Sequence, residues 1–180
     1  ALYNGHRRSQ DIDLFSDFAF DTGQMLESLV QDFDYSLLYA APNTLKGAIG
    51  DVKVDLISHR YNLIDHPVSE DNISILSEKD IIAMKLNAIS TSGQRIKDFV
   101  DIYFLLEKYD IKTMLGFYKK KYKQDNDLLV LKSLIYFYDV EESEWPVIIR
   151  EPDLRWKDVR KKIEKKVIEY SRRETEGTTG

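Results

Sequence analysis

Two aspartates, Asp11 and Asp13, lie two residues apart in the alternating stretch DIDLF. Aspartate is depleted in strands because its short polar side chain prefers turns and helix caps. In a strand, positions i and i+2 share one face and lie about 6–7 Å apart along the backbone. Carboxylate oxygens are the ligands that Mg²⁺ prefers. The pair therefore indicates either a metal site of the kind used in nucleotidyl transfer, or an exposed polar strand face.

A third carboxylate, Asp55, lies in a second alternating stretch, residues 51–58, whose valine and leucine residues face the other way. If the two strands are neighbours, three carboxylates gather on one face of a sheet. Without cations they would repel one another. We therefore predict adjoining strands with a metal-binding face. The alternative is that Lys53 and Arg60 neutralise the acids as ordinary surface pairs.

Lys85 lies inside the apolar stripe of a helix that we expect to begin after Ser77, followed three residues later by Asp80 as in a capping box. Lysine rarely occupies such a position without a partner. A carboxylate or a substrate phosphate would serve as that partner. The alternative is that the aliphatic stem packs while the ammonium reaches water.

Asp98 and Asp101 share the inward face of the next expected helix with two apolar residues. Asp98 can pair with Lys85 or orient a nucleophile, and Asp101 can pair with Arg95 or with a backbone amide. Acidic residues also suit the first turn of a helix, because its N-terminus carries a partial positive charge.

The periodicity of apolar residues changes from about two to about 3.6 along the chain, which predicts an α+β fold. A small mixed β-sheet with one helix is expected first, and a C-terminal helical bundle follows. We expect domains at 1–76 and 77–174 and a flexible tail at 175–180. The expected strands are 10–15, 35–42, 45–49 and 51–58. The expected helices are 21–33, one that starts near Asp80 and extends past Ile89, and 96–108, 114–123, 128–140 and 156–170.

The composition excludes several kinds of site. The sequence has no cysteine and only three histidines, which excludes disulfides and cysteine nucleophiles and argues against zinc. No apolar run approaches the roughly 18–20 residues that cross a membrane. No signal segment opens the sequence either. We therefore expect a cytoplasmic protein without a membrane partner.

Basic residues are concentrated near the end of the chain. Nine Lys or Arg and three acidic residues lie between Arg155 and Arg173, although the formal net charge of the whole chain is −5. Such a segment can contact phosphate backbones, and the lysines of residues 119–123 form a second candidate. The alternative is a helix with an ordinary solvated face.

Three stretches, GHRRSQDIDLF, KVDLI and DIIAMKLNAISTSGQRIKDFVDIYFLL, match a known pattern in order. Together they resemble the AbiEii/AbiGii family of nucleotidyltransferase toxins, within the polymerase-β-like nucleotidyltransferase superfamily. The resemblance covers roughly residues 1–108, and the helical remainder is similar only loosely. It implies that the sheet is a nucleotidyltransferase core.

The resemblance also implies roles for individual residues. Asp11 and Asp13 would hold Mg²⁺ and the triphosphate of an NTP, and Asp55 would join them as a ligand of the two Mg²⁺ ions. Asp55 would also help to activate the attacking group, Lys85 would hold phosphates, and Asp98 would support the catalytic site. The stretch that precedes the metal-binding pair would bind the nucleotide through His6, Arg7 and Ser9.

The sequence departs from the family pattern at two places. The family has a Gly-Gly, Gly-Ser or Gly-Thr turn before the position of Ala1, where backbone amides grip the triphosphate. We therefore expect the front edge of the core to be missing, which would weaken nucleotide binding. Lys97 stands where the family usually has arginine, and lysine cannot reproduce a bidentate contact.

The resemblance implies a bacterial abortive-infection toxin of a toxin–antitoxin pair. It would move a nucleoside monophosphate from an NTP to the 3′ end of an RNA such as tRNA, or to a protein hydroxyl. Two alternatives remain. One is a catalytically inactive relative that acts as a binding or regulatory module; the other is a sheet-plus-bundle protein whose inward charges are structural ion pairs.

Overall fold

The computed structural model describes residues 3–71 and 73–177. They divide into two compact units: residues 9–61, here called the sheet unit, and the other described residues, here called the helical unit. The expected α+β fold is confirmed. The expected division at residue 76 stays a prediction.

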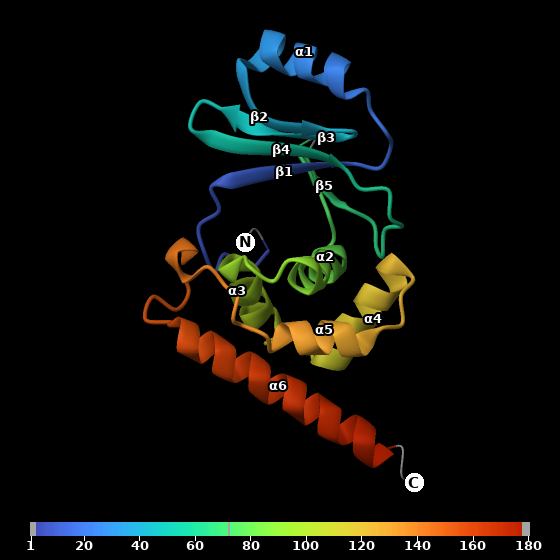
Figure 1. The fold of residues 1–180 in the computed structure, drawn as a ribbon, viewed down its shortest axis with the longest axis vertical. Helices are drawn as coiled ribbons and strands as arrows, with labels where there is room; N and C mark the ends of the chain where they lie inside the picture. Colours follow the sequence, from blue (N-terminus) through green and yellow to red (C-terminus); the bar gives the residue numbers. More distant parts are fainter. Residues whose placement is uncertain (1–2, 72, 178–180) are drawn as a thin grey trace. The chain divides into compact units, whose positions relative to one another are not determined.

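The sheet unit is a four-stranded mixed sheet with one helix packed against β2 and β3 (Figure 1). The strand order is β1-β4-β3-β2. β1 runs parallel to β4, and the other neighbours are antiparallel. The elements are β1 Asp11–Ser16, α1 Thr22–Phe33, β2 Tyr35–Ala41, β3 Thr44–Ile49 and β4 Val52–Ser58.

Local sequence explains how these elements begin and pack. Asp21 caps α1, because its carboxylate accepts a hydrogen bond from the Gln24 amide at 2.8 Å. The Tyr35 ring packs against Gly47, where an added Cβ would lie only 2.5 Å from the ring and 2.3 Å from the Ser36 carbonyl oxygen. The glycine thus lets the Tyr35 hydroxyl donate to the Val54 carbonyl oxygen at 3.0 Å.

The helical unit holds the main hydrophobic core, which the helices build together (Figure 1). Phe99 is fully buried there and makes edge-on contacts with Phe137 and Trp156. The elements are β5 Val68–Glu70, β6 Ile73–Ile75, α2 Glu78–Thr91, α3 Ile96–Leu105, α4 Ile111–Tyr122, α5 Asp127–Leu134, the 3₁₀ helix η1 Glu142–Glu144, and α6 Trp156–Gly177.

Three details differ from the sequence-based expectations. The hairpin of β5 and β6 was not expected, because each strand has only three residues. The helix expected over 128–140 ends at Leu134, and Phe137 leaves the helical path to pack against Phe99 and Trp156. α6 continues to Gly177, so the start of the expected tail is helical, and residues 178–180 lie outside the described part.

No helix among the described residues is long and apolar enough to cross a membrane.

Candidate functional site

The two strands that carry the aspartates are neighbours, as predicted. β1 pairs with β4 in parallel, with Asp13 opposite Asp55 and Asp11 opposite Lys53. Residues that lie opposite each other in a parallel ladder project to the same face of the sheet. The three carboxylates therefore share one face of the sheet unit. We call Asp11, Asp13 and Asp55 the strand carboxylates.

Asp55 is the most buried of the three, at 6% exposure. Its Oδ1 atom is buried without a hydrogen-bond partner in the described part of the chain. Its Oδ2 atom lies 3.9 Å from Lys53 Nζ, and the Lys53 side chain is 50% exposed. A surface ion pair of this length compensates a buried carboxylate poorly. The Asp55 charge also acts on Tyr35, whose pKa is raised by burial first and by Asp55 second.

The donor chemistry of this face fits a hard divalent cation. Asp13 and Asp55 come from neighbouring strands, and a buried carboxylate oxygen without a donor is the kind of atom that a cation would satisfy. Mg²⁺ in nucleotide sites is commonly held by one or two carboxylates together with substrate phosphates. Across residues 3–71 and 73–177, no group of three or more His or acidic side chains is already gathered closely enough to hold an ion.

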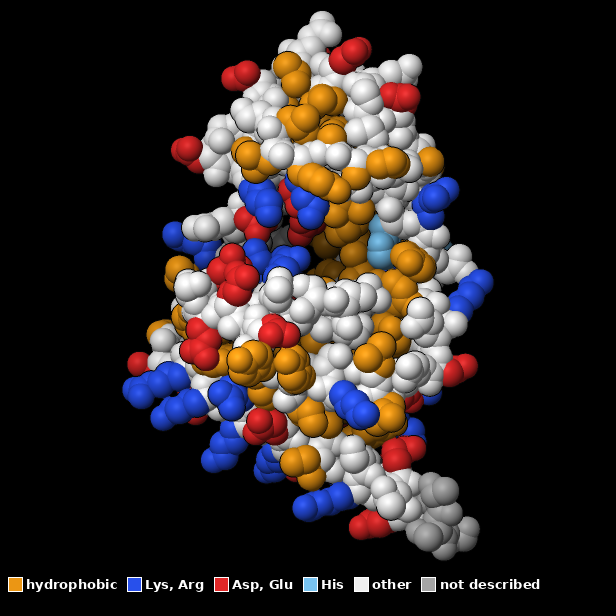
Figure 2. Space-filling view, in the orientation of Figure 1, with side chains coloured by type: hydrophobic (Ala, Val, Ile, Leu, Met, Phe, Trp, Pro, Cys, Tyr) orange, Lys and Arg blue, Asp and Glu red, His pale blue; other side chains and the backbone are white. Residues whose placement is uncertain are grey.

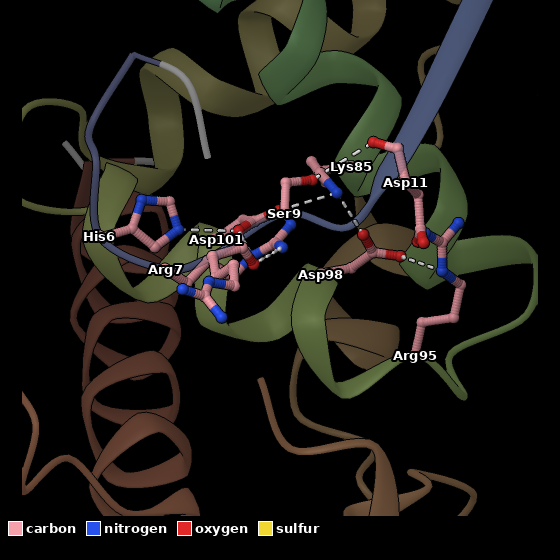
Figure 3. A network of polar contacts seen from close by, with 9 residues as sticks. His6, Arg7, Ser9, Asp11, Lys85, Arg95, Asp98 and Asp101 are labelled. Atoms are coloured by element: carbon pink, nitrogen blue, oxygen red, sulfur yellow. Dashed lines mark hydrogen bonds and ion pairs between the residues drawn. The ribbon is translucent and has the colours of Figure 1, made fainter. Parts of the chain in front are cut away.

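In the helical unit, Asp101 is the centre of a buried charge network (Figure 3). Its side chain is 3% exposed. Oδ1 accepts from His6 Nε2 at 2.8 Å and from Arg7 Nε at 2.6 Å, while Oδ2 accepts from Arg7 Nη2 at 2.9 Å. Lys85 Nζ lies 2.8 Å from Oδ2. The bidentate arginine contact is the strong form of this interaction.

Lys85 also contacts the other aspartate of α3, Asp98, with Nζ 2.5 Å from Asp98 Oδ1, and so bridges Asp98 and Asp101 (Figure 3). Arg95 Nε lies 3.7 Å from the other oxygen of Asp98. The Lys85 side chain is 19% exposed and both carboxylates are nearly buried. Lys85 therefore has the carboxylate partner that its position in the apolar stripe predicted.

The pKa values in this network are set by opposing effects. Burial would lower the pKa of the Lys85 ammonium, but the charges of Asp101 and Asp98 outweigh it and raise that pKa. Burial would raise the pKa of the Asp101 carboxyl, but Lys85, His6 and Arg7 hold it well below its usual range. Lys85 and Asp101 therefore each favour the charged form of the other.

One expected pairing is wrong. Asp101 was expected to pair with Arg95 or with a backbone amide, but its partners are His6, Arg7 and Lys85. Arg95 is the N-cap residue of α3, so it reaches Asp98, three residues later, instead of Asp101, six residues later. His6 and Arg7 lie more than 90 residues before Asp101 in the sequence, so no local pattern identifies them as its partners.

The segment that carries His6 and Arg7 is built into the helical unit. The His6 carbonyl oxygen accepts from the Ile149 amide at 2.8 Å, and Arg7 forms an isolated β-bridge with Ile148. The His6 ring lies 4.5 Å from the Phe104 ring, and its Nδ1 atom is buried without a hydrogen-bond partner among the described residues. The nucleotide-binding roles expected for His6 and Arg7 stay predictions.

Ser9, the third residue of that prediction, belongs to the sheet unit. Its hydroxyl oxygen lies 3.5 Å from the Asp11 carbonyl oxygen. This long contact keeps the hydroxyl next to the start of β1. Its nucleotide-binding role also stays a prediction.

A second buried ion pair, Asp80 with Lys121, was missed. Both side chains are 0% exposed, and their charged atoms lie 2.7 Å apart. Lys121 belongs to the run of lysines at residues 119–123, which the sequence offered as a second candidate for contact with phosphate backbones. Its spacing could have revealed it, because Lys121 follows Met114 and Tyr118 on the buried stripe of α4.

Comparison with known protein families identifies one family. The family model described as "Nucleotidyl transferase AbiEii toxin, Type IV TA system" matches residues 36–174. A protein of Aquifex aeolicus (strain VF5), "Uncharacterized protein aq_aa25", is 33% identical over 172 residues, which cover 92% of this chain and 81% of that protein. No solved structure gives a significant match. The family match includes Asp55, Lys85 and Asp98 and begins after Asp13.

Proposed function

Because the chain belongs to the family of AbiEii nucleotidyl transferase toxins from type IV toxin–antitoxin systems, we propose that it transfers a nucleoside monophosphate from an NTP to an acceptor hydroxyl. The hydroxyl would belong to an RNA, with a tRNA 3′ end as the candidate, or to a protein. Pyrophosphate is the leaving group. A cognate antitoxin would oppose the activity.

One observation carries this proposal: Asp13 and Asp55 are paired residues of two neighbouring strands, and Asp55 has a buried oxygen without a hydrogen-bond donor. A folded protein seldom keeps a buried carboxylate oxygen unsatisfied without a functional reason. Together with membership in a nucleotidyltransferase family, this supports a site for a divalent cation and a triphosphate.

The strand carboxylates and Lys85 would have different roles in the transfer. Asp13 and Asp55, with Asp11 on the same face, would hold the magnesium and orient the triphosphate. Bound Mg²⁺ ions supply Lewis-acid stabilisation of charge at the transferring phosphoryl group. Asp55 would accept a hydrogen bond from the attacking hydroxyl and help to take its proton. Lys85, kept charged by Asp98 and Asp101, would hold phosphate oxygens.

The test is calorimetric titration of each of the four NTPs into the full chain, with Mg²⁺ and again with EDTA. We expect magnesium-dependent binding of at least one NTP. The double variant Asp13→Asn/Asp55→Asn should lose it, and the matched control Asp51→Asn, at an exposed turn of the same unit, should keep it.

Transfer itself is tested with an α-³²P-labelled form of the NTP that binds, incubated with total RNA or total protein. Label in the RNA or the protein fraction would identify the class of acceptor. Magnesium-dependent NTP binding without transfer to either fraction would contradict the proposed enzyme and favour the binding or regulatory module. Absence of binding by the parent chain would remove the transferase proposal.

A further inference from the structure

Three aromatic side chains lie in contact in the sheet unit, where β1 and β4 end. The Phe15 ring centroid lies 5.7 Å from that of His59, and the His59 centroid lies 4.9 Å from that of Tyr61. Tyr61 is 51% exposed and Phe15 is 38% exposed. Figure 2 shows hydrophobic side chains gathered on the surface of the sheet unit. We call Phe15, His59 and Tyr61 the aromatic cluster.

The aromatic cluster lies on the same face of the sheet as the strand carboxylates. Phe15 follows Asp11 and Asp13 at two-residue intervals along β1, so its side chain projects to the face that they share. The contact between the Phe15 and His59 rings places His59 on that face as well. Asp13 and Phe15 are about 7 Å apart along the strand. The cluster therefore begins one step beyond the carboxylates, toward the carboxyl ends of two parallel strands.

Hydrogen bonds fix the backbone that carries the cluster. The His59 amide donates to the Ser16 carbonyl oxygen at 2.7 Å, which extends the pairing of β1 and β4 beyond Ser58. The hydroxyls of Ser16 and Ser58 both donate to the Phe18 carbonyl oxygen, at 2.6 and 2.9 Å. The loop after β1 is thereby held against the end of β4. A ligand surface that is ordered in advance loses less conformational entropy on binding.

A role in stability alone explains the cluster poorly. Aromatic side chains stabilise a fold mainly through the apolar surface that they bury. Phe15 and Tyr61 leave much of their surface exposed, on a sheet face that also carries charged carboxylates. A ligand with a flat aromatic face would cover that surface, and a nucleobase is such a ligand.

We propose that the aromatic cluster stacks on the base of the NTP whose triphosphate the strand carboxylates and magnesium hold. This inference rests on the proposed function and adds a base-binding subsite to it. The ribose would span the step of about 7 Å from the carboxylates to the cluster. Every nucleobase has an aromatic face, so stacking depends little on which base is bound. The cluster would therefore distinguish a nucleotide from a bare triphosphate more than one base from another.

The test compares the four NTPs with inorganic tripolyphosphate, which has the phosphates but no base. Binding of each to the full chain is measured by calorimetry with Mg²⁺. In the variant Phe15→Leu/Tyr61→Leu, the affinity for NTP should fall by roughly 10- to 100-fold, because the base loses its stacking partners. The affinity for tripolyphosphate should stay within about twofold of the parent value, which also shows that the variant is folded.

Two control variants separate the aromatic rings from the fold. Phe33→Leu/Tyr39→Leu removes one phenylalanine and one tyrosine of similar exposure elsewhere in the sheet unit, and should leave the NTP affinity unchanged. Tyr61→Phe keeps the aromatic ring and should bind NTP like the parent chain. An equal fall of NTP affinity in both double variants would overturn the proposal. In the cluster variant, an unchanged NTP affinity, or an equal fall for NTP and tripolyphosphate, would also overturn it.

A fluorescent nucleoside distinguishes this inference from the proposed function. 2-Aminopurine riboside has no phosphate, and its fluorescence is quenched when its base stacks on an aromatic ring. The parent chain at high concentration should quench it without Mg²⁺, and the cluster variant should not. Quenching by a chain that binds no NTP with Mg²⁺ would uphold the aromatic cluster and remove the transferase. Equal magnesium-dependent affinity for NTP and tripolyphosphate, without quenching, would do the reverse.

Discussion

The buried aspartates of the helical unit and Asp55, the buried strand carboxylate of the sheet unit, are surrounded very differently. Asp80 accepts from Lys121 Nζ at 2.7 Å, from the Ser77 hydroxyl at 2.5 Å and from the Ile64 amide at 3.0 Å. Asp101 is equally well supplied by two basic side chains and a histidine. Asp55 keeps a buried oxygen with no donor among the described residues.

This difference separates a structural carboxylate from a candidate functional one. Once its oxygens are saturated by cations and amides, a buried aspartate stabilises the fold and has little capacity left for a ligand. A carboxylate that is buried without donors costs stability, and a bound cation would recover it. The two classes should therefore respond in opposite ways to substitution and to magnesium.

The largest effect is expected at Asp80. The variant Asp80→Asn would leave the fully buried Lys121 ammonium without its counter-charge, and breaking a buried pair from one side costs about 3–5 kcal/mol. Urea denaturation of the full chain measures the loss in free energy of unfolding. The control is Asp65→Asn, which breaks the exposed pair with Lys79 and should cost less than about 1 kcal/mol. Equal losses of unfolding free energy in the two variants would show that the buried Asp80–Lys121 pair is worth no more to stability than an exposed pair.

A somewhat smaller loss is expected for Asp101→Asn, about 3 kcal/mol. Lys85 would keep Asp98 as a partner, whereas the Arg7 guanidinium would lose both carboxylate contacts. Denaturation of Asp101→Asn beside Asp98→Asn measures the difference, and the Asp101 variant should be the less stable of the two. The opposite order would show that Asp98 holds the network together.

Stability should also fall in acid because of these carboxylates. Burial opposes ionisation of Asp80 and Asp101, but their basic partners and hydrogen-bond donors hold both pKa values below the usual range. A group whose pKa is lowered by folding stabilises the protein above its unfolded pKa, about 3.9, and loses that contribution as pH falls through the folded value.

Denaturation at several pH values between 7 and 3 measures this contribution. The free energy of unfolding should decline below about pH 4 in the parent chain. The decline should be shallower in Asp101→Asn, because that variant no longer has the group to protonate. Parallel curves for the two proteins would mean that other acids set the acid limit.

Sequence reasoning predicted the strand carboxylates better than the helical network. Alternation in two short stretches predicted that Asp11 and Asp13 share a face and that Asp55 joins them if the two strands are neighbours, and β1 does pair with β4. Lys85 was also placed correctly, by its position in an apolar stripe. The partner of Asp101 was not predicted, because His6 and Arg7 lie more than 90 residues away and only the tertiary fold brings them together.

The missed Asp80–Lys121 pair has a different cause. A run of four basic residues among five usually lies in solvent. The composition of the run therefore gives no sign that one of its lysines, Lys121, faces inward on its helix. Asp80 was recognised for its place three residues after Ser77, but not as a buried acceptor. Whether an ionisable side chain is buried depends on which helices pack against it, and local pattern does not specify that.

The smallest effect on stability, and the sharpest test of the comparison, is expected at the strand carboxylates. The variants Asp13→Asn and Asp55→Asn remove charge from a face where like charges oppose one another, so the free energy of unfolding should change by less than about 1 kcal/mol.

Mg²⁺ with NTP should raise the melting temperature of the parent chain, because a ligand that binds only the folded state stabilises it, and neither variant should show the full rise. Asp101→Asn should lower the starting melting temperature yet keep a rise with ligand. If Asp55→Asn instead destabilises the chain as strongly as Asp101→Asn and leaves the ligand effect intact, Asp55 is a structural carboxylate, and the distinction between the two classes fails.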